Sequence, residues 1–263
     1  MKDINKRSLS KKYIDSAVVQ KEIVARLMDR LSLINISPKK IVDIGAGVGL
    51  GSKEIITRYP EASCFMLDNS IESLNENISK DINVYEVCAN FKKIPFKNNS
   101  FDLIFSSSAL HWDLDIRSSF KEIYRILRPG GLFLFATYGP NTLIELRSAW
   151  SRIDEYKHVN DFYDMHDIGD LMQSINFNDS VVDVENIIIE YKDVAQLQID
   201  LKNIGSKVIY SKENNQSLIS KNKMKKMYNE YERFRLEDGN LPATYEVIFG
   251  SAWKKFDILQ KVD

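Results

Sequence analysis

Short apolar runs alternate with amphipathic segments along the first half of the chain. The runs are rich in β-branched and aromatic residues and end at turn residues, which is typical of buried strands. The segments between them carry apolar residues at helical spacing. The pattern predicts strands at 41–44, 64–67, 83–88, 102–106 and 131–137, and helices at 17–33, 50–58, 70–78 and 116–127. Strands that alternate with helices indicate an α/β fold with helices on both faces of a mostly parallel sheet.

The pattern changes after Tyr138. It predicts helices at 141–156, 165–175, 194–204 and 218–237, a strand at 181–191 and a final strand at 244–250. Ligands of open α/β sheets bind outside the carboxyl ends of the strands, where long insertions come to lie. We therefore expect a cofactor-binding core at 1–138, a helical lid or substrate-binding insertion within 139–240 that leaves 181–191 to the sheet, and the last strand with the C-terminus at 241–263.

A glycine-rich run follows the first predicted strand directly. Gly45, Gly47 and Gly49 alternate with other residues, and glycine allows positive φ and a close approach of the backbone to a ligand. Neither the glycine order of the dinucleotide fingerprint nor the Gly-Lys-Ser/Thr ending of the phosphate loop fits this run. Asp68 ends the second strand, where a carboxylate can accept hydrogen bonds from the two hydroxyls of a ribose. The run indicates a site for an adenosine-containing cofactor; a glycine-rich turn without a ligand is the alternative.

The order Asp43-x-Gly45-x-Gly47-x-Gly49 resembles motif I of the class I S-adenosylmethionine-dependent methyltransferases, and 91–96, 100–106 and 110–112 resemble their later motifs. The resemblance implies a Rossmann-like three-layer sandwich with a seven-stranded sheet and an antiparallel last strand, and S-adenosylmethionine as cofactor with S-adenosylhomocysteine as product. Asn90 stands where the family usually has an acid that bonds the adenine amino group. The residues that would bind the cofactor are Gln20, Asp43, Gly45, Ala46, Gly47, Gly49, Asp68, Asn69, Asn90, Phe91, Ser107 and Trp112.

Four further stretches resemble the BioC-type malonyl-acyl-carrier-protein O-methyltransferases, which make the methyl ester that starts biotin synthesis. They lie at 13–20, 138–150, 158–169 and 241–253, with a weaker match at 200–205. The resemblance implies O-methylation of the free carboxylate of a malonyl thioester, carried by acyl carrier protein or by coenzyme A, in the cytoplasm. The residues we expect near the reacting atoms are Tyr13, His111, Tyr138, Arg147 and Asn160.

Arg147 is the candidate that would bind the substrate carboxylate, because a guanidinium offers a fork of donors that matches a carboxylate. The alternative is a solvated helix face on which Arg147 pairs with Glu145 or Asp154. A lone histidine such as His111 is more often a structural residue than a catalyst.

Two other functions remain open. One is a different small-carboxylate methyltransferase, similar to the trans-aconitate enzymes, although its C-terminal strand is not expected to read Pro-Ala-Thr-Tyr-Glu. The other is a methyltransferase-like factor, similar to those that assemble respiratory complexes, which acts on a protein partner.

Composition and net charge limit further which functions the chain can have. A net charge of −1 over 263 residues gives no global field that favours nucleic acid or a membrane. The N-terminus has no apolar stretch typical of a signal peptide, and Cys64 and Cys88 fall in predicted strands, which is typical of buried residues in a reducing compartment. Three histidines without metal-site spacing argue against a metal.

A lysine-rich stretch is a candidate docking surface for the acidic carrier protein, or simply a solvated face: Lys207, Lys212, Lys221, Lys223, Lys225 and Lys226. The sequence leaves the oligomeric state open.

Overall fold

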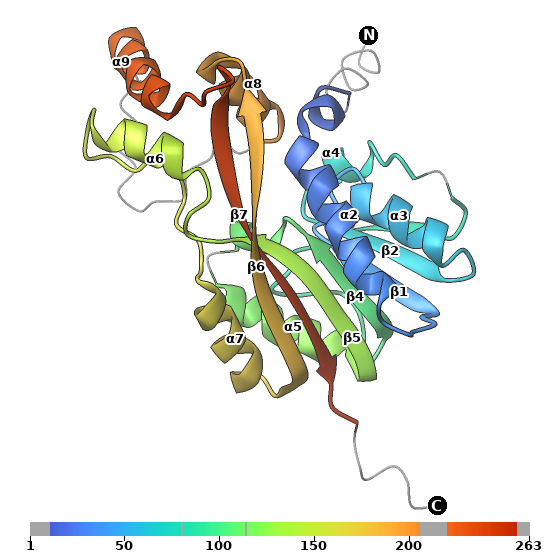
Figure 1. Ribbon diagram of the computed structural model, residues 1–263. Coiled ribbons are helices and arrows are strands. Elements are labelled where there is room, and N and C mark those ends of the chain that lie inside the picture. The colour runs from blue at the N-terminus through green and yellow to red at the C-terminus, as the bar shows by residue number, and fades with distance from the viewer. Residues whose placement is uncertain (1–10, 80, 114, 206–219, 257–263) are drawn as a thin grey trace, which may run out of the picture. The chain divides into compact units, whose positions relative to one another are not determined.

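The computed structural model describes residues 11–79, 81–113, 115–205 and 220–256. Their strands form a seven-stranded sheet in the order β3-β2-β1-β4-β5-β7-β6 (Figure 1). The strands are β1 Lys40–Ile44, β2 Ser63–Asp68, β3 Val84–Cys88, β4 Phe101–Ser107, β5 Leu127–Tyr138, β6 Phe177–Tyr191 and β7 Leu241–Lys254. The helices are α2 Val18–Ser32, α3 Leu50–Arg58, α4 Ile71–Leu74, α5 Ile116–Ile126, α6 Ile144–Ser151, α7 Met165–Ser174, α8 Val194–Asn203 and α9 Lys221–Tyr231, with short 3₁₀ turns η1 Leu110–Trp112 and η2 Glu232–Phe234.

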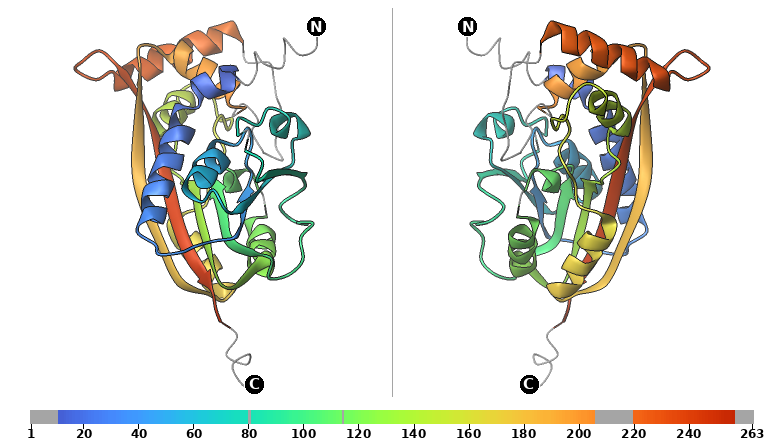
Figure 2. Two further views of the ribbon diagram at one scale, coloured as in Figure 1. Left: turned by 90° about the vertical axis from the view of Figure 1, so that its right-hand side faces the viewer. Right: turned by 90° about the vertical axis from the view of Figure 1, so that its left-hand side faces the viewer.

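The first five strands are parallel, and the last strand of the chain is antiparallel. Ile41 on β1 lies opposite Cys64 on β2 and Leu103 on β4, so β1 is central. β7 runs in the opposite direction to β5 (Figure 1). Helices α2 and α3 cover one face of this sheet and α5 covers the other (Figure 2). The predicted Rossmann-like methyltransferase fold is confirmed.

One hydrophobic cluster joins the sheet to α5 and α7. Phe120 on α5 packs edge-to-face on Phe133 of β5, with ring centroids 5.4 Å apart. Ile168 and Met172 on α7 are fully buried in the same cluster. We expected α7 to lie in the lid, but its apolar side chains belong to the core of the sheet.

The described residues divide into two compact units. The larger unit comprises Gln20–Tyr138, Tyr163–Val184 and the chain from Ile248 onward, and the smaller unit comprises the chain up to Val19 with Gly139–Phe162 and Glu185–Val247. Strands β6 and β7 contribute residues to both units. The expected site residues are described below unit by unit.

Polar side chains shorten two of the predicted helices. The helix expected at 70–78 is only Ile71–Leu74, because the Asn77 side chain accepts a hydrogen bond from Ser79 N (2.7 Å) and donates one to Glu86 (3.0 Å). Such bonds compete with helical ones. The helix expected at 141–156 begins only at Ile144, since Asn141 N bonds the Glu246 carboxylate.

Three further points concern strands, cysteines and membrane spans. β5 and β7 extend beyond the predicted 131–137 and 244–250. Cys64 is buried as expected, but Cys88 is exposed, so that part of the cysteine prediction is wrong. None of the helices in the described parts of the chain has the length and hydropathy needed to cross a membrane.

Candidate functional site

The glycine-rich loop leaves β1 with three left-handed residues. Gly45, Gly47 and Gly49 have φ values of 72°, 55° and 87°, which glycine adopts without a steric penalty. A Cβ at Gly45 would lie 2.1 Å from the Cβ of Ala109, whereas a Cβ at Gly47 would meet no atom within 4 Å. Gly45 is therefore required by packing inside the protein. Gly47 borders open space and presents backbone that a ligand can approach.

Asp68 lies at the end of β2 and supports this loop. Its Oδ2 accepts a hydrogen bond from Gly47 N (2.9 Å), and its Oδ1 accepts one from Ser70 N (2.8 Å). A carboxylate has about four acceptor sites, so two remain for further donors. The buried carboxylate therefore fixes the glycine loop and retains capacity for the hydroxyls of a ribose.

Asp43 near the end of β1 is buried, and its Oδ2 lies 3.0 Å from where a Cβ of Gly51 would be. The Ser52 hydroxyl donates a hydrogen bond of 2.7 Å to its Oδ2. Burial raises the pKa of Asp43 from 3.8 to about 7; the Ser52 hydrogen bond opposes this rise, and the nearby charge of Asp68 adds to it. Sequence reasoning missed Ser52, whose only signal was its place in the first turn after the glycines.

The loop between β3 and β4 carries Asn90 and Phe91. Asn90 Oδ1 accepts a hydrogen bond from Lys92 N (2.9 Å), and Phe91 Cζ lies 3.5 Å from where a Gly45 Cβ would be. Lys92 also pairs with the buried carboxylate of Asp113 at 3.2 Å, which ties this loop to the one after β4. Asp113 is a further residue that the sequence did not single out.

An aromatic group follows β4 and reaches β5. The His111 ring lies 4.8 Å from the Trp112 ring and 4.5 Å from the Tyr138 ring, measured between centroids. Gln20 Nε2 donates a hydrogen bond to the Tyr138 hydroxyl at 3.3 Å. Burial lowers the pKa of His111 to about 3, so its imidazole is neutral at neutral pH. The structure thus brings together four residues that the sequence proposed separately.

The strand register gathers the expected cofactor residues at one edge of the sheet. Asp68 is in register with Cys88 on β3, and Asp43 with Phe105 on β4, two residues before Ser107. The carboxyl ends of β1 to β4 therefore meet side by side. Cys88 Sγ bonds the backbone oxygen of Asn69 at this edge (3.7 Å), and Ala46 N donates to the backbone oxygen of Leu67 (3.1 Å).

In the smaller unit, Arg147 contacts two backbone carbonyls and the carboxylate of Asp161. Its Nε donates to Thr142 O (3.3 Å), and a terminal nitrogen donates to Asn160 O, so Arg147 and Asn160 are neighbours. The other terminal nitrogen lies 3.8 Å from Asp161. Burial lowers the pKa of Arg147, and the Asp161 charge opposes this. The side chain is 27% exposed, which leaves its outer edge accessible.

The alternative partners of Arg147 are occupied elsewhere. Glu145 accepts hydrogen bonds from Thr244 N (3.0 Å) and from the Thr244 hydroxyl. Asp154 bonds His158 and Lys223, each at 2.8 Å. The alternative in which Arg147 pairs with Glu145 or Asp154 is therefore wrong.

The segment before Arg147 is held by β7. Glu246 accepts bonds from Asn141 N (2.7 Å) and Asn141 Nδ2 (3.0 Å), and its backbone oxygen accepts one from the Thr142 hydroxyl (3.0 Å). Tyr13 lies half-buried in the same unit, in the helical segment 11–16. Sequence reasoning missed the contacts of Glu246 with this segment, because Asn141 and Thr142 are 105 and 104 positions away in the sequence.

The described residues hold no group of three or more histidine, cysteine, aspartate or glutamate side chains placed to bind a metal ion. Lys207 and Lys212, which we included in the lysine-rich stretch, lie outside the described residues.

Comparison with known proteins agrees with these observations. The model of the methyltransferase domain family matches residues 42–135. The chain is 40% identical over 241 residues to malonyl-acyl-carrier-protein O-methyltransferase 1 of Coxiella burnetii, covering 92% of this chain and 83% of that protein. It is 39% identical to the malonyl-acyl-carrier-protein O-methyltransferase of Legionella pneumophila, covering 92% and 86%. Among solved structures, the YcgJ protein of Bacillus subtilis matches the fold with a TM-score of 0.62 at 18% identity, over 88% of this chain and 98% of that chain.

Proposed function

Because the chain belongs to the family of malonyl-acyl-carrier-protein O-methyltransferases, we propose that it methylates the free carboxylate of a malonyl thioester on acyl carrier protein. The identity to these relatives covers 92% of the chain, including the smaller unit, and this observation carries the proposal. The product is a methyl ester that initiates the pimeloyl part of biotin, made in the cytoplasm. Malonyl-coenzyme A is the alternative form of the substrate.

The residues of the larger unit fit S-adenosylmethionine. The open space at Gly47, the remaining acceptor sites of Asp68 and the amide of Asn90 match a ligand with a ribose and an adenine. When bound, this cofactor supplies a methyl group activated on a sulfonium. The cofactor-binding role would be shared with the residues around them at the carboxyl edge: Gln20, Asp43, Gly45, Ala46, Gly49, Asn69, Phe91, Ser107 and Trp112.

The reaction needs alignment more than it needs a base. A carboxylic acid with a pKa of about 4 is ionised at neutral pH, so no proton has to be removed before it attacks. A carboxylate oxygen would receive the methyl group of bound S-adenosylmethionine, with S-adenosylhomocysteine as the second product. Holding the two reactants in line contributes on the order of 7–11 kcal/mol in favourable systems. The neutral His111 ring, packed on Trp112 and Tyr138, would shape the site rather than take a proton.

Arg147 would orient the carboxylate, with Tyr13, Tyr138 and Asn160 as helpers. Its bonds to the carbonyls of Thr142 and Asn160 fix the guanidinium in place while its exposed edge still offers donors. A charge-assisted hydrogen bond contributes about 1.5–3 kcal/mol. Arg147→Ala should therefore raise the KM for the malonyl substrate about 10- to 100-fold.

Arg152→Ala is the matched control, because Arg152 follows the same helix, is 52% exposed and pairs with Glu230. It should leave the KM unchanged. The dissociation constant for S-adenosylhomocysteine should be the same in both variants. Unchanged turnover of malonyl-carrier protein by Arg147→Ala would remove Arg147 from the site.

Exposed lysines on α9 would contact the acidic carrier protein. Lys221, Lys225 and Lys226 are exposed, whereas Lys223 is engaged with Asp154 at 2.8 Å. Salt screens such contacts, since the Debye length is about 8 Å at physiological ionic strength. Added salt should slow methylation of malonyl-carrier protein far more than that of malonyl-coenzyme A. Equal salt sensitivity would rule out this dock.

The decisive experiment is the intact mass of malonyl-acyl carrier protein after incubation with the enzyme and S-adenosylmethionine. A gain of one methyl group, absent with acetyl-carrier protein, is the expected result because only the malonyl group has a free carboxylate. No gain by an enzyme that binds S-adenosylhomocysteine would refute the proposal and point to a protein substrate.

A further inference from the structure

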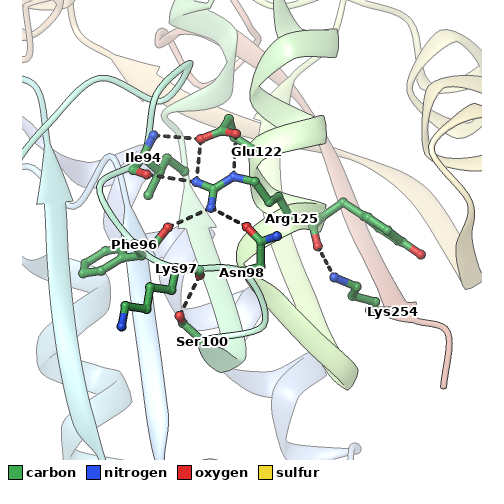
Figure 3. A network of polar contacts seen from close by, with 9 residues as sticks. Ile94, Phe96, Lys97, Asn98, Ser100, Glu122, Arg125 and Lys254 are labelled. Carbon is green, nitrogen blue, oxygen red and sulfur yellow. Dashed lines mark hydrogen bonds and ion pairs between the residues drawn. The ribbon is translucent and has the colours of Figure 1, made fainter. Parts of the chain in front are cut away.

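The guanidinium of Arg125 on α5 is engaged with the loop between β3 and β4 (Figure 3). Its terminal nitrogens donate to Ile94 O (2.9 Å), Phe96 O (2.7 Å) and Asn98 Oδ1 (3.0 Å). Its Nε and one terminal nitrogen donate to the two carboxylate oxygens of Glu122, at 2.7 and 2.8 Å. An arginine has five N–H donors, and these five bonds use all of them.

Glu122 completes the contact by bonding the same loop. Its Oε2 accepts a hydrogen bond from Ile94 N at 2.9 Å, so both backbone polar groups of Ile94 are bonded by the pair. The hydrogen bond from Arg125 lowers the pKa of Glu122, which stays ionised at neutral pH. Bidentate arginine–carboxylate pairs are the strong form of this interaction. We call Glu122 and Arg125 the α5 clamp.

The clamped loop is the one that carries Asn90 and Phe91. At its start, Ala89 N donates to the backbone oxygen of Asp68 (2.9 Å). At Ile94, whose side chain is 3% exposed, the clamp and the core fix the chain again. Asn90 and Phe91 lie between these two fixed points, so the position of Ile94, together with the Lys92–Asp113 pair, limits where they can be.

Helix α5 does not need the clamp for its own packing. Phe120, Ile123 and Ile126 are fully buried against the sheet and attach the helix. The loop, by contrast, is irregular from Ala89 to Ser100, and its carbonyls at Ile94 and Phe96 are bonded by Arg125. The clamp therefore acts mainly on the shape of the loop.

We propose that Glu122 and Arg125 are positioning residues for recognition of the adenine ring. Their hydrogen bonds go to each other and to the loop. They hold the loop so that the Asn90 amide oxygen and the Phe91 ring stand where the adenine binds. This proposal rests on the cofactor assignment of the proposed function, and it adds two residues on α5 that determine the preference for the base.

The test compares two ligands in conservative variants. Arg125→Lys keeps the charge but loses the fork of donors, and Glu122→Gln keeps the shape but loses the charge. Arg117→Lys is the control, because Arg117 lies on the same helix and bonds only the Ser174 hydroxyl among its described partners. Calorimetry would give dissociation constants for S-adenosylhomocysteine and for its inosine analogue, which carries an oxygen in place of the adenine amino group.

Arg125→Lys should weaken the binding of S-adenosylhomocysteine about tenfold, equivalent to about 1.4 kcal/mol, and should reduce the preference for adenine over hypoxanthine. Glu122→Gln should move both constants in the same direction, and Arg117→Lys should move neither. The kcat at saturating cofactor should stay within about twofold of wild type, because the reacting atoms are untouched.

A purely structural pair would give a different result. In that case Arg125→Lys would lower the melting temperature and leave both dissociation constants and their ratio unchanged, which would overturn the proposal. Wild-type protein that failed to bind S-adenosylhomocysteine would instead refute the cofactor assignment, so the two failures are distinguishable.

Discussion

Replacing Gly47 with alanine should separate cofactor binding from folding. Gly47 has a φ of 55°, and an added Cβ would meet no atom of the protein within 4 Å. The substitution therefore creates no internal clash, unlike one at Gly45. The methyl group that Gly47→Ala adds would instead clash with a ligand that approaches the loop closely.

The cost in stability follows from the backbone conformation. A non-glycine residue in the left-handed region costs roughly 1–2 kcal/mol, while alanine restricts the unfolded chain and returns roughly 0.4–1 kcal/mol. The net loss in the free energy of unfolding is thus about 1 kcal/mol. Gly239 has a φ of 87° and also no atom within 4 Å, so Gly239→Ala should lose the same amount.

Urea unfolding and calorimetry with S-adenosylhomocysteine measure the two effects separately. Both variants should lose about 1 kcal/mol in the free energy of unfolding. Only Gly47→Ala should weaken the binding of S-adenosylhomocysteine, by about tenfold or more, equivalent to about 1.4 kcal/mol. Gly239 lies in an exposed turn of the smaller unit and controls for backbone strain. Equal affinity in Gly47→Ala and Gly239→Ala would refute the assignment of the open space to the cofactor.

Three more substitutions test the same reasoning. Gly45→Ala should destabilise the fold more than Gly47→Ala, by about 1–3 kcal/mol of added overpacking against Ala109, and equal urea midpoints would contradict this. Because burial raises the pKa of Asp43 from 3.8 to about 7, the folded protein keeps a proton there that the unfolded chain releases. The stability of wild type relative to Asp43→Asn should therefore fall by about 4 kcal/mol as the pH rises from about 4 to 7, and a constant difference in pH-dependent unfolding would disprove it. Thr244→Val removes the hydroxyl that bonds the buried Glu145 carboxylate, so it should lower the free energy of unfolding by about 1–3 kcal/mol. A urea unfolding midpoint equal to that of wild type would show that this bond contributes nothing to stability.

Local patterns were sufficient for the first five strands and the glycine-rich loop of the larger unit. The strands at β1 to β5 follow from apolar runs, and the loop after β1 follows from the alternation of glycines. Both signals depend only on residues close together in the sequence, so they can be recognised without knowledge of the rest of the fold. Parallel pairing then places Asp68 and Asn90 near the loop, since the carboxyl ends of neighbouring strands meet.

Contacts between distant side chains were not predictable in the same way. Asn77 ended a helix by bonding Glu86, a partner on the next strand. The pair Glu122 and Arg125 is visible at helical spacing, yet nothing in that spacing shows that it bonds the loop at Ile94. Such contacts depend on the tertiary structure, which a local pattern does not contain.

The smaller unit shows why separate stretches carried one resemblance. Two of those stretches, 138–150 and 241–253, are hydrogen-bonded to each other through the carboxylates of Glu145 and Glu246. Glu145 accepts from Thr244, and Glu246 accepts from Asn141, so each stretch supplies an acid to the backbone of the other. Arg147 lies in the first stretch and bonds the carbonyl of Thr142, whose hydroxyl is itself bonded to the second. The C-terminal strand therefore supports Arg147. Under the substrate-binding role proposed for Arg147, a change at Thr244 or Glu246 should weaken substrate binding by shifting this arginine.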